Sequence, residues 1–191
     1  FDLKGRVALV TGAGAGIGRA IALALGAAGA FVGVHYHASQ QEAEETLATL
    51  REGGGDGVLL PADLTSEREA TGTVENVLTR AGRLDILVNN AGSPIERCRI
   101  EDCSTELWRQ VFDVNVTSAF FVIRRAIPAL RASGAGSIIN NLTLSVQTGG
   151  AGGAGPYAAA KGALQVLTRT LARELAPQVR ANAVMPGVIE T

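Results

Sequence analysis

The sequence predicts an α/β protein built on a doubly wound parallel sheet with helices on both faces. Short apolar runs that favour strands alternate along the chain with longer segments that carry helical patterns or caps. The glycines concentrate between these segments rather than in a low-complexity tail. No linker or change of composition divides the 191 residues, so we expect one domain over 1–191.

Six strands are expected, each a short apolar run that ends at glycine, proline or a polar residue. They lie at residues 7–10, 31–36, 58–60, 84–88, 137–140 and 181–185. The last strand is stopped by Pro186 and Gly187. Each strand but the last is followed by a segment with helical character, which predicts right-handed βαβ units and hence parallel strands.

Five helices are expected between the strands, at residues 21–25, 39–51, 66–80, 105–131 and 157–175. Ser39 with Glu42, and Ser66 with Glu69, have the spacing of a capping box, in which each partner binds a free backbone N–H of the other. The fourth helix is long and contains Pro128, which should bend it or mark a frayed last stretch.

Composition and charge exclude several classes of protein. Hydrophobic residues make up 47% of the chain, and the net charge of −1 provides no basic surface for nucleic acid or an anionic membrane. No apolar run reaches the length of a membrane span, and the N-terminus has no signal pattern. Cys98 and Cys103 are too few for a disulfide framework and have no histidine cluster for zinc. We therefore expect reduced thiols in a cytoplasmic protein without a metal.

A glycine-rich turn joins the first expected strand to the first helix. Gly12, Gly16 and Gly18 fit a Gly-x-x-x-Gly-x-Gly spacing, whereas the Gly-x-Gly-x-x-Gly pattern fails at Ile17 and Arg19. No Gly-Lys-Ser/Thr follows, so a phosphate loop of the Walker type is excluded. Glycines here let the backbone approach a pyrophosphate, whose charge the N-terminus of the helix would favour.

Tyr157 and Lys161 are the second unusual feature. The chain has 17 basic residues, of which only Lys4 and Lys161 are lysine, and one of its two tyrosines lies four residues before Lys161. Residues four apart are neighbours on a helix face. A compact ammonium beside a phenol suits a tyrosine that must lose and regain a proton, so the pair predicts a tyrosine acid/base.

Six stretches together resemble the short-chain dehydrogenase/reductase family. They run in the family's order and comprise residues 11–18, Asp63-Leu64, Asn89-Asn90-Ala91-Gly92, Asn115, residues 157–161 and residues 186–191. The resemblance is closest to members similar to 3-oxoacyl-carrier-protein reductases and to sugar or polyol dehydrogenases. It implies a Rossmann-like domain that binds a nicotinamide cofactor and transfers hydride to a carbonyl or from an alcohol.

The resemblance also assigns cofactor contacts to individual positions. The residues at 89–92 follow the fourth strand at the carboxyl edge, where open α/β sheets bind ligands. In the family this stretch borders the adenosine, Asp63 faces the adenine, and the stretch from Pro186 covers the nicotinamide. The expected cofactor-binding residues are Gly12, Gly16, Ile17, Gly18, Tyr36, His37, Asp63, Leu64, Asn89, Ala91, Gly92, Tyr157, Lys161, Pro186, Gly187, Ile189 and Thr191.

The expected catalytic residues are Asn115, Thr143, Tyr157 and Lys161. A free tyrosine has a pKa of about 10, which a nearby ammonium and the positive nicotinamide ring would lower. By resemblance Lys161 also holds the cofactor ribose, and Asn115 ties a water into the proton path. The family places a serine beside the tyrosine. Here Thr143 stands at that position and keeps a hydroxyl, with Ser145 as the rival if the loop is shifted in register.

The end of the second expected strand bears on the choice between NAD and NADP. NAD-preferring Rossmann proteins place an acid there to hold the ribose 2′-hydroxyl. Here Tyr36 stands at that position and no acid is present, which favours NADP(H). The usual arginine for a 2′-phosphate is also absent, and Ala15 stands where a basic residue is common in the turn. The side chains that could serve instead are His35, His37 and Ser39.

Three functions remain open at this point. The first is a carbonyl reductase or alcohol dehydrogenase linked to NADP(H). The second is an NAD-linked sugar or polyol dehydrogenase, and the third is a non-catalytic dinucleotide-binding scaffold or sensor. Family members continue past the Pro-Gly stretch into a substrate lid and a last strand, which we expect to be absent from the 191 residues. The family pairs its long helices between subunits, so a homotetramer or homodimer is expected.

Overall fold

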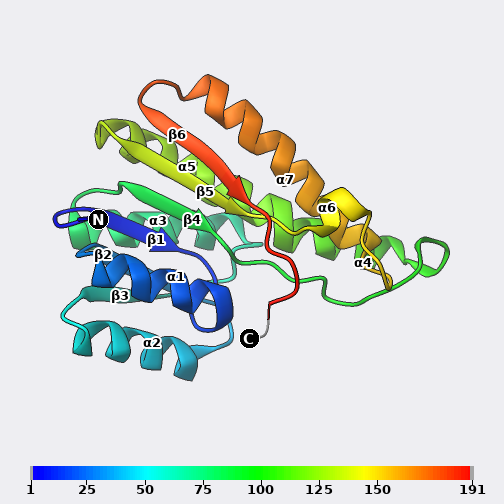
Figure 1. Cartoon of the computed structure of the whole chain (residues 1–191), viewed down its shortest axis with the longest axis horizontal. Helices are drawn as coiled ribbons and strands as arrows, with labels where there is room; N and C mark the ends of the chain where they lie inside the picture. The colour runs from blue at the N-terminus through cyan, green and yellow to red at the C-terminus, as the bar shows by residue number, and fades with distance from the viewer. Residues whose placement is uncertain (1, 190–191) are drawn as a thin grey trace.

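The computed structural model describes residues 2–189 and contains a parallel sheet of six strands in the order β3-β2-β1-β4-β5-β6 (Figure 1). The strands are β1 (Val7–Val10), β2 (Phe31–Tyr36), β3 (Asp56–Pro61), β4 (Ile86–Asn89), β5 (Gly136–Asn141) and β6 (Val179–Val184). The predicted α/β, doubly wound, Rossmann-like fold is therefore confirmed.

Helices connect successive strands and complete the α/β alternation. They are α1 (Gly16–Ala27), α2 (Gln40–Glu52), α3 (Glu67–Ala81), α4 (Thr105–Phe112), α5 (Ser118–Ala132), α6 (Ser145–Thr148) and α7 (Gly155–Glu174), with a 3₁₀ turn at Ile100–Asp102 and a π-helical turn at Asp113–Thr117. None of these helices is long and apolar enough to cross a membrane, among the residues described.

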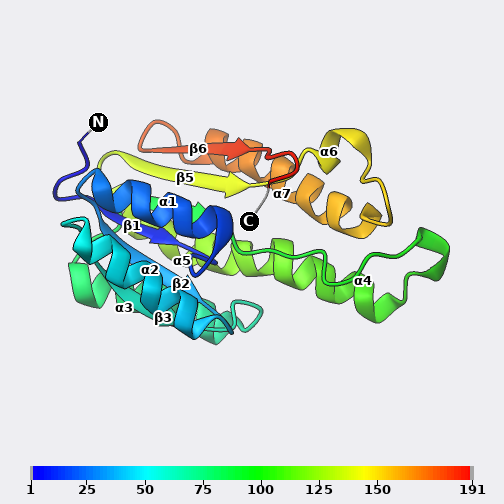
Figure 2. The same cartoon turned by 60° about the horizontal axis from the view of Figure 1, so that its bottom comes forward.

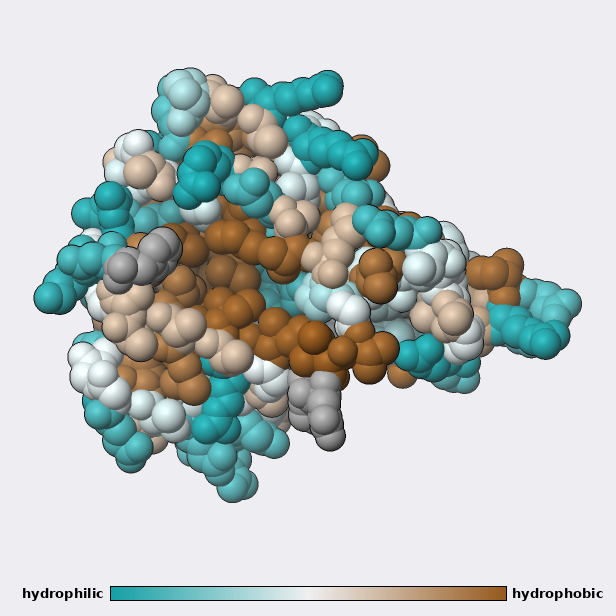
Figure 3. Space-filling view, viewed as in Figure 1, coloured by the Kyte–Doolittle hydropathy of each residue, from teal (hydrophilic) through white to brown (hydrophobic). Residues whose placement is uncertain are grey.

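Two apolar cores lie on opposite faces of the sheet. Side chains of α3, α5 and α7 pack with Leu9, Leu87 and Ile138 on one face, and side chains of α1 and α2 pack with Val10 and Val34 on the other. Alternating side chains of one strand serve the two faces, as in any sheet. In Figures 1 and 2, α1 and α2 cover the half of their face formed by β1 to β3. An apolar band crosses the same view in Figure 3.

The direction of the strands brings their carboxyl ends to one edge. Val10 pairs with Val34 of β2 on one side and with Val88 of β4 on the other, and Asn89 pairs with Asn140 of β5. The chain runs outward from β1 in both directions, so β1 and β4 meet at a topological switch point. Ligands of open α/β sheets bind in the crevice beyond the strand ends at such a point.

The capping boxes form only in part. The hydroxyl of Ser39 accepts no capping hydrogen bond, so the box predicted at the start of α2 is wrong. Ser66 does accept a bond from the backbone N–H of Glu69 at 3.4 Å, but the carboxylate of Glu69 accepts from the N–H of Asp63 at 2.8 Å instead. Glu69 thus binds the loop after β3 rather than the backbone N–H of Ser66, its partner in a capping box.

The long helix expected at 105–131 is a continuous helical stretch with a π-helical turn in it. A π turn adds one residue to the helical repeat and often marks a functional position. Helix α5 continues through Pro128 to Ala132, so the proline does not end it. The sequence also missed the short helix α6, and α1 begins at Gly16 rather than near residue 21.

Candidate active site

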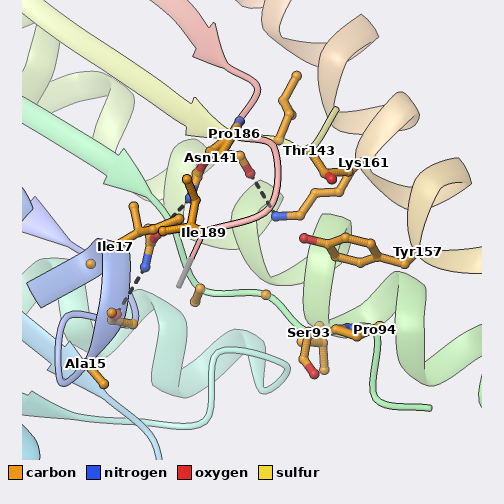
Figure 4. Close-up of a pocket in the computed structure, with 18 of the residues that line it drawn as sticks. Ala15, Ile17, Ser93, Pro94, Asn141, Thr143, Tyr157, Lys161, Pro186 and Ile189 are labelled. Carbon is orange, nitrogen blue, oxygen red and sulfur yellow. Dashed lines mark hydrogen bonds between the residues drawn. The ribbon is translucent and has the colours of Figure 1, made fainter. Parts of the chain in front are cut away.

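A cleft of about 1040 Å³ opens at the carboxyl edge of the sheet, over the switch point between β1 and β4 (Figure 4). It brings together most of the residues that the sequence predicted. Those that line it are Gly12, Gly16, Ile17, Gly18, Tyr36, His37, Ala91, Gly92, Thr143, Tyr157, Lys161, Pro186, Gly187 and Ile189. Residues 130 or more positions apart in the chain therefore form one cavity.

Four predicted residues lie outside the lining, and Thr191 lies outside the described residues. Asp63 is engaged by its own loop, because its carboxylate accepts from the N–H and the hydroxyl of Thr65 at 2.9 and 2.7 Å. Leu64 and Asn115 are buried, and so is Asn89, whose amide donates to Asn140 at 2.8 Å. Contacts of Asp63, Leu64 and Asn89 with a cofactor stay predictions.

The glycine turn forms the floor of the cleft at the start of α1. Gly12 has a φ of +63°, and a Cβ at Gly18 would lie 2.0 Å from the carbonyl oxygen of Gly12. No larger residue fits at Gly18 without moving the turn. The first turn of α1 contains no acidic residue, so its free N–H groups face no competing charge. These features fit a pyrophosphate at the N-terminus of α1.

His35 holds the turn in place. The N–H of Gly12 donates to Nδ1 of the imidazole at 3.0 Å, so Nε2 carries the proton and donates to the carbonyl of Ala62 at 3.1 Å. Burial lowers the pKa of His35 to about 4, which leaves the ring uncharged at neutral pH. The idea that His35 supplies a positive charge for a 2′-phosphate is therefore wrong. His37, in contrast, is exposed and lines the cleft.

Two asparagines connect the turn to Lys161, namely Asn90 of the predicted stretch at 89–92 and Asn141, which the sequence analysis did not name. The amide of Asn90 donates to the carbonyls of Thr11 and Gly12, each at 3.0 Å. Asn141 donates to Oδ1 of Asn90 at 2.8 Å, and its backbone carbonyl accepts from Nζ of Lys161 at 2.8 Å (Figure 4). One feature of the sequence could have pointed to Asn141: a second amide side chain follows Asn140 at the end of an otherwise apolar strand.

Tyr157 and Lys161 project from α7 into the cleft, with Nζ of Lys161 5.8 Å from the centre of the Tyr157 ring (Figure 4). Burial lowers the pKa of Lys161, which is 2% exposed, to about 8. Burial also raises the pKa of Tyr157. The expected lowering by the ammonium is therefore wrong for the free protein, because Nζ is directed at Asn141 and desolvation of the phenolate dominates.

Asn115 occupies the π-helical turn and is completely buried. Its amide nitrogen donates to the carbonyls of Val111 and Ser93 at 2.8 and 2.7 Å, and its Oδ1 accepts from the N–H of Ser93 at 3.1 Å. A Cβ at Gly92 would lie 2.5 Å from this oxygen and 2.8 Å from Nζ of Lys161. Asn115 therefore fixes the segment after β4 against Lys161.

Thr143 and Ser145 occupy different places in the loop after β5. Thr143 lines the cleft on the same side as Tyr157 and Lys161, whereas Ser145 begins α6 and does not line the cleft (Figure 4). The backbone N–H of Ser145 donates to the Thr143 hydroxyl at 3.2 Å. That bond orients the Thr143 oxygen as an acceptor and leaves its proton free to donate.

The electrostatic character of the cleft is cationic. Among the described residues that line it, none is aspartate or glutamate, whereas Arg97 and Lys161 are basic. The guanidinium of Arg97 contacts only the carbonyls of Ala151 and Gly152, at 3.3 and 3.4 Å, among the hydrogen bonds of residues 2–189. Such a lining suits a ligand that carries phosphate groups. In the same part of the chain no cluster of three or more metal-ligating side chains occurs.

A parallel sheet with a glycine turn and a cationic cleft at its switch point is the arrangement of a nucleotide-binding α/β protein, and Tyr157 and Lys161 lie together in that cleft. Comparison with known proteins gives the particular family. Residues 6–191 match the model of the short chain dehydrogenase family, and the chain belongs to it. It is thus an NAD(P)-dependent dehydrogenase/reductase that acts on CH–OH or C=O groups.

Individual relatives agree with this assignment. The chain is 37% identical to cyclopentanol dehydrogenase of Comamonas sp. over 97% of this chain and 74% of the relative. It is 36% identical to the chloroplastic NADPH-dependent aldehyde reductase 1 of Arabidopsis thaliana over 99% and 67%, respectively. The crystal structure of the NADH-dependent reductase A1-R′ complexed with NAD superposes with a TM-score of 0.93 at 35% identity, covering 98% of this chain and 80% of that one.

Proposed function

We propose that the protein interconverts a carbonyl compound and a secondary alcohol with NADP(H), using Tyr157 as the general acid/base. The observation that carries the proposal is the position of Tyr157 and the buried Lys161 in the same cleft as the glycine turn. In Figure 4, Tyr157 and Lys161 lie on one side of this cavity, and Ala15 and Ile17 of the glycine turn lie on the other, which supports the proposal.

The chemistry follows from the protonation states. When bound, the nicotinamide cofactor supplies the hydride for reduction and accepts it in oxidation. A carbonyl that gains hydride at carbon needs a proton at oxygen, and the phenol of Tyr157 donates it and becomes a phenolate. The raised pKa of Tyr157 keeps the proton on the phenol in the free protein at neutral pH. Lys161, with a pKa of about 8, is mostly protonated at pH 7 and stabilises the phenolate.

The other side chains support this step. Thr143 donates a hydrogen bond to the substrate oxygen, and Lys161 holds a ribose hydroxyl of the cofactor. Asn115, whose side chain is fully engaged, keeps Ser93 and the neighbouring Gly92 in place and so shapes the pocket under the nicotinamide. A proton path through a water at Asn115 remains part of the proposal.

Replacing Tyr157 by phenylalanine tests the acid/base role. We expect kcat/KM for a panel of ketones, β-ketoacyl thioesters and polyols to fall by about 10² to 10⁴, the usual contribution of general acid/base catalysis. Cofactor affinity, measured by the fluorescence of the reduced nicotinamide, should change little because the ring remains. Near-normal turnover in this variant would contradict the assignment. Cofactor binding without turnover in the unmodified protein would support a scaffold or sensor.

The preference for NADP(H) rests on the rim of the cleft at the end of β2. Tyr36 and the exposed His37 lie there with Ser39, and among residues 2–189 no acidic side chain lines the cleft to repel a 2′-phosphate. We expect NADPH to bind more tightly than NADH in parallel titrations at low ionic strength, and replacement of His37 by glutamate to reverse the order. Clearly tighter NADH binding by the unmodified protein would favour the NAD-linked sugar or polyol dehydrogenase.

A further inference from the structure

Asn141 has a buried polar atom for which the protein provides no partner. Its Oδ1 is inaccessible to solvent and accepts no hydrogen bond from any described residue, although Asn141 lines the cleft. An unpaired buried acceptor destabilises a fold, and native proteins rarely keep one without a reason. The residue is 7% exposed and lies at the end of β5, beside the catalytic loop.

The orientation of the Asn141 amide follows from its neighbours. Asn90 uses its nitrogen for the carbonyls of Thr11 and Gly12, so it must present its oxygen to Asn141. Asn141 therefore donates to Asn90 through nitrogen, at 2.8 Å, and its own oxygen is the atom left over. Turning the amide over would place two oxygens against each other. The unpaired atom is thus an acceptor and needs a donor.

The position of Asn141 indicates which part of a ligand could provide the donor. Its backbone carbonyl holds Lys161, and it is followed by Leu142 and Thr143, which both line the cleft. Asn141 therefore lies beside Lys161, to which a dashed line joins it in Figure 4. A dinucleotide has donors in its nicotinamide half, namely the hydroxyls of the nicotinamide ribose and the carboxamide N–H groups.

We propose that Oδ1 of Asn141 accepts a hydrogen bond from the nicotinamide half of the bound cofactor. The proposal rests on the dinucleotide-binding function given above and adds a contact that the sequence analysis did not assign. The oxygen of this side chain then binds the ligand. Its nitrogen donates to Asn90, which in turn donates to the carbonyl of Gly12 in the glycine turn.

Binding measurements on Asn141→Val test the contact without relying on turnover. The probes are NADPH, 2′-phospho-ADP-ribose and 2′-phospho-ADP, or NADH, ADP-ribose and ADP if NADH binds more tightly. We expect the variant to bind the dinucleotide about tenfold more weakly, as for the loss of one buried hydrogen bond, and the ADP part as before. A loss that extends to the ADP-ribose part identifies the ribose hydroxyl as the donor, and a loss confined to the dinucleotide identifies the carboxamide.

Two controls separate this contact from a structural effect. Asn140→Val changes the adjacent residue, which is fully buried, does not line the cleft, and bonds through its amide to Asn89 and Thr168. It should lower the melting temperature but leave the ratio of dinucleotide to ADP affinity unchanged. Asn141→Thr keeps an acceptor in a smaller side chain and should recover part of the dinucleotide affinity if the valine variant folds poorly.

Two results would overturn the inference. Unchanged dinucleotide affinity in a folded Asn141→Val protein would mean that the oxygen has no ligand contact. An equal loss for the ADP part would mean that Asn141 acts only through Asn90 and the glycine turn. If the unmodified protein binds no dinucleotide at all, the proposed function itself fails, which is a separate outcome.

Discussion

Burial sets the ionisation of the titratable residues in the cleft. His35 is held neutral by burial and by the N–H of Gly12, which donates to Nδ1, and desolvation disfavours both the phenolate of Tyr157 and the ammonium of Lys161. The protein thus keeps Tyr157 as a neutral phenol and disfavours the ammonium of Lys161, which the negative charge of a phosphate-bearing ligand would stabilise again. Tyr157 is therefore in the protonation state that the proposed acid role requires.

The buried lysine should make stability depend on pH. Its pKa falls from 10.5 to about 8 on folding, so between these values the unfolded chain holds a proton that the folded protein has released. Stability must then rise with pH across this window, by about 1.4 kcal/mol per unit at most, whereas below pH 8 the buried ammonium destabilises the fold by an amount that no longer changes with pH.

Denaturant titrations at pH 7, 9 and 10 measure this effect. We expect the free energy of unfolding of Lys161→Met to exceed that of the unmodified protein at pH 7. This excess should become smaller at pH 9 and 10, where the unmodified protein gains stability. Lys4→Met, which replaces the only other lysine at an exposed position, provides the background. A difference independent of pH would show that the lysine charge is not desolvated.

Short elements at the sheet edge decide which hydroxyl-bearing residue lines the cleft. The loop after β5 passes directly into α6, and Ser145 is the first residue of that helix. Its backbone N–H, not its side chain, is directed at Thr143. The sequence left open which of the two residues lies at the cleft. In the structure Thr143 lines it and Ser145 does not.

We expect Thr143→Ala to lower kcat/KM by about tenfold to a hundredfold, because one hydrogen bond to the reacting oxygen is lost. Ser145→Ala, the matched change two residues later, should retain nearly full activity. Steady-state kinetics on one ketone substrate with both variants decide the question. The opposite result would assign the hydroxyl role to Ser145. A Thr143→Ser variant should remain active.

The π-helical turn is a second element with a functional consequence. An ordinary α-helix through residues 105–132 would not place the Asn115 amide on both Val111 and the Ser93 backbone. The extra residue in the turn allows one side chain to join the helix to the segment after β4. Neither propensity nor spacing in the sequence predicts this turn.

At the scale of the whole molecule, apolar side chains remain exposed on three helices. Trp108 on α4, Phe120 on α5 and Val166 on α7 are 39%, 39% and 59% exposed. We propose that copies of the protein associate through these helices as a homotetramer or homodimer. The family resemblance and the exposure of these apolar side chains support this proposal.

Light scattering after size-exclusion chromatography tests the assembly. We expect a mass of two or four chains for the unmodified protein, and a shift toward smaller species for Val166→Glu, because a buried charge without a partner is costly. Gln41→Glu adds the same charge at an exposed position of α2 and should not change the mass. A monomer at micromolar concentration would contradict the proposal.

The sequence by itself determined the alternation of strands and helices, the glycine turn and the Tyr157–Lys161 pair. These features depend on local periodicity, backbone freedom and the helical repeat, which neighbouring residues specify. Only the tertiary structure decided that His35 is neutral, that Thr143 rather than Ser145 lines the cleft, and that Asn141 has an unpaired oxygen. Hydrogen-bond partners and desolvation depend on residues that are distant in the chain and meet only when the sheet has formed.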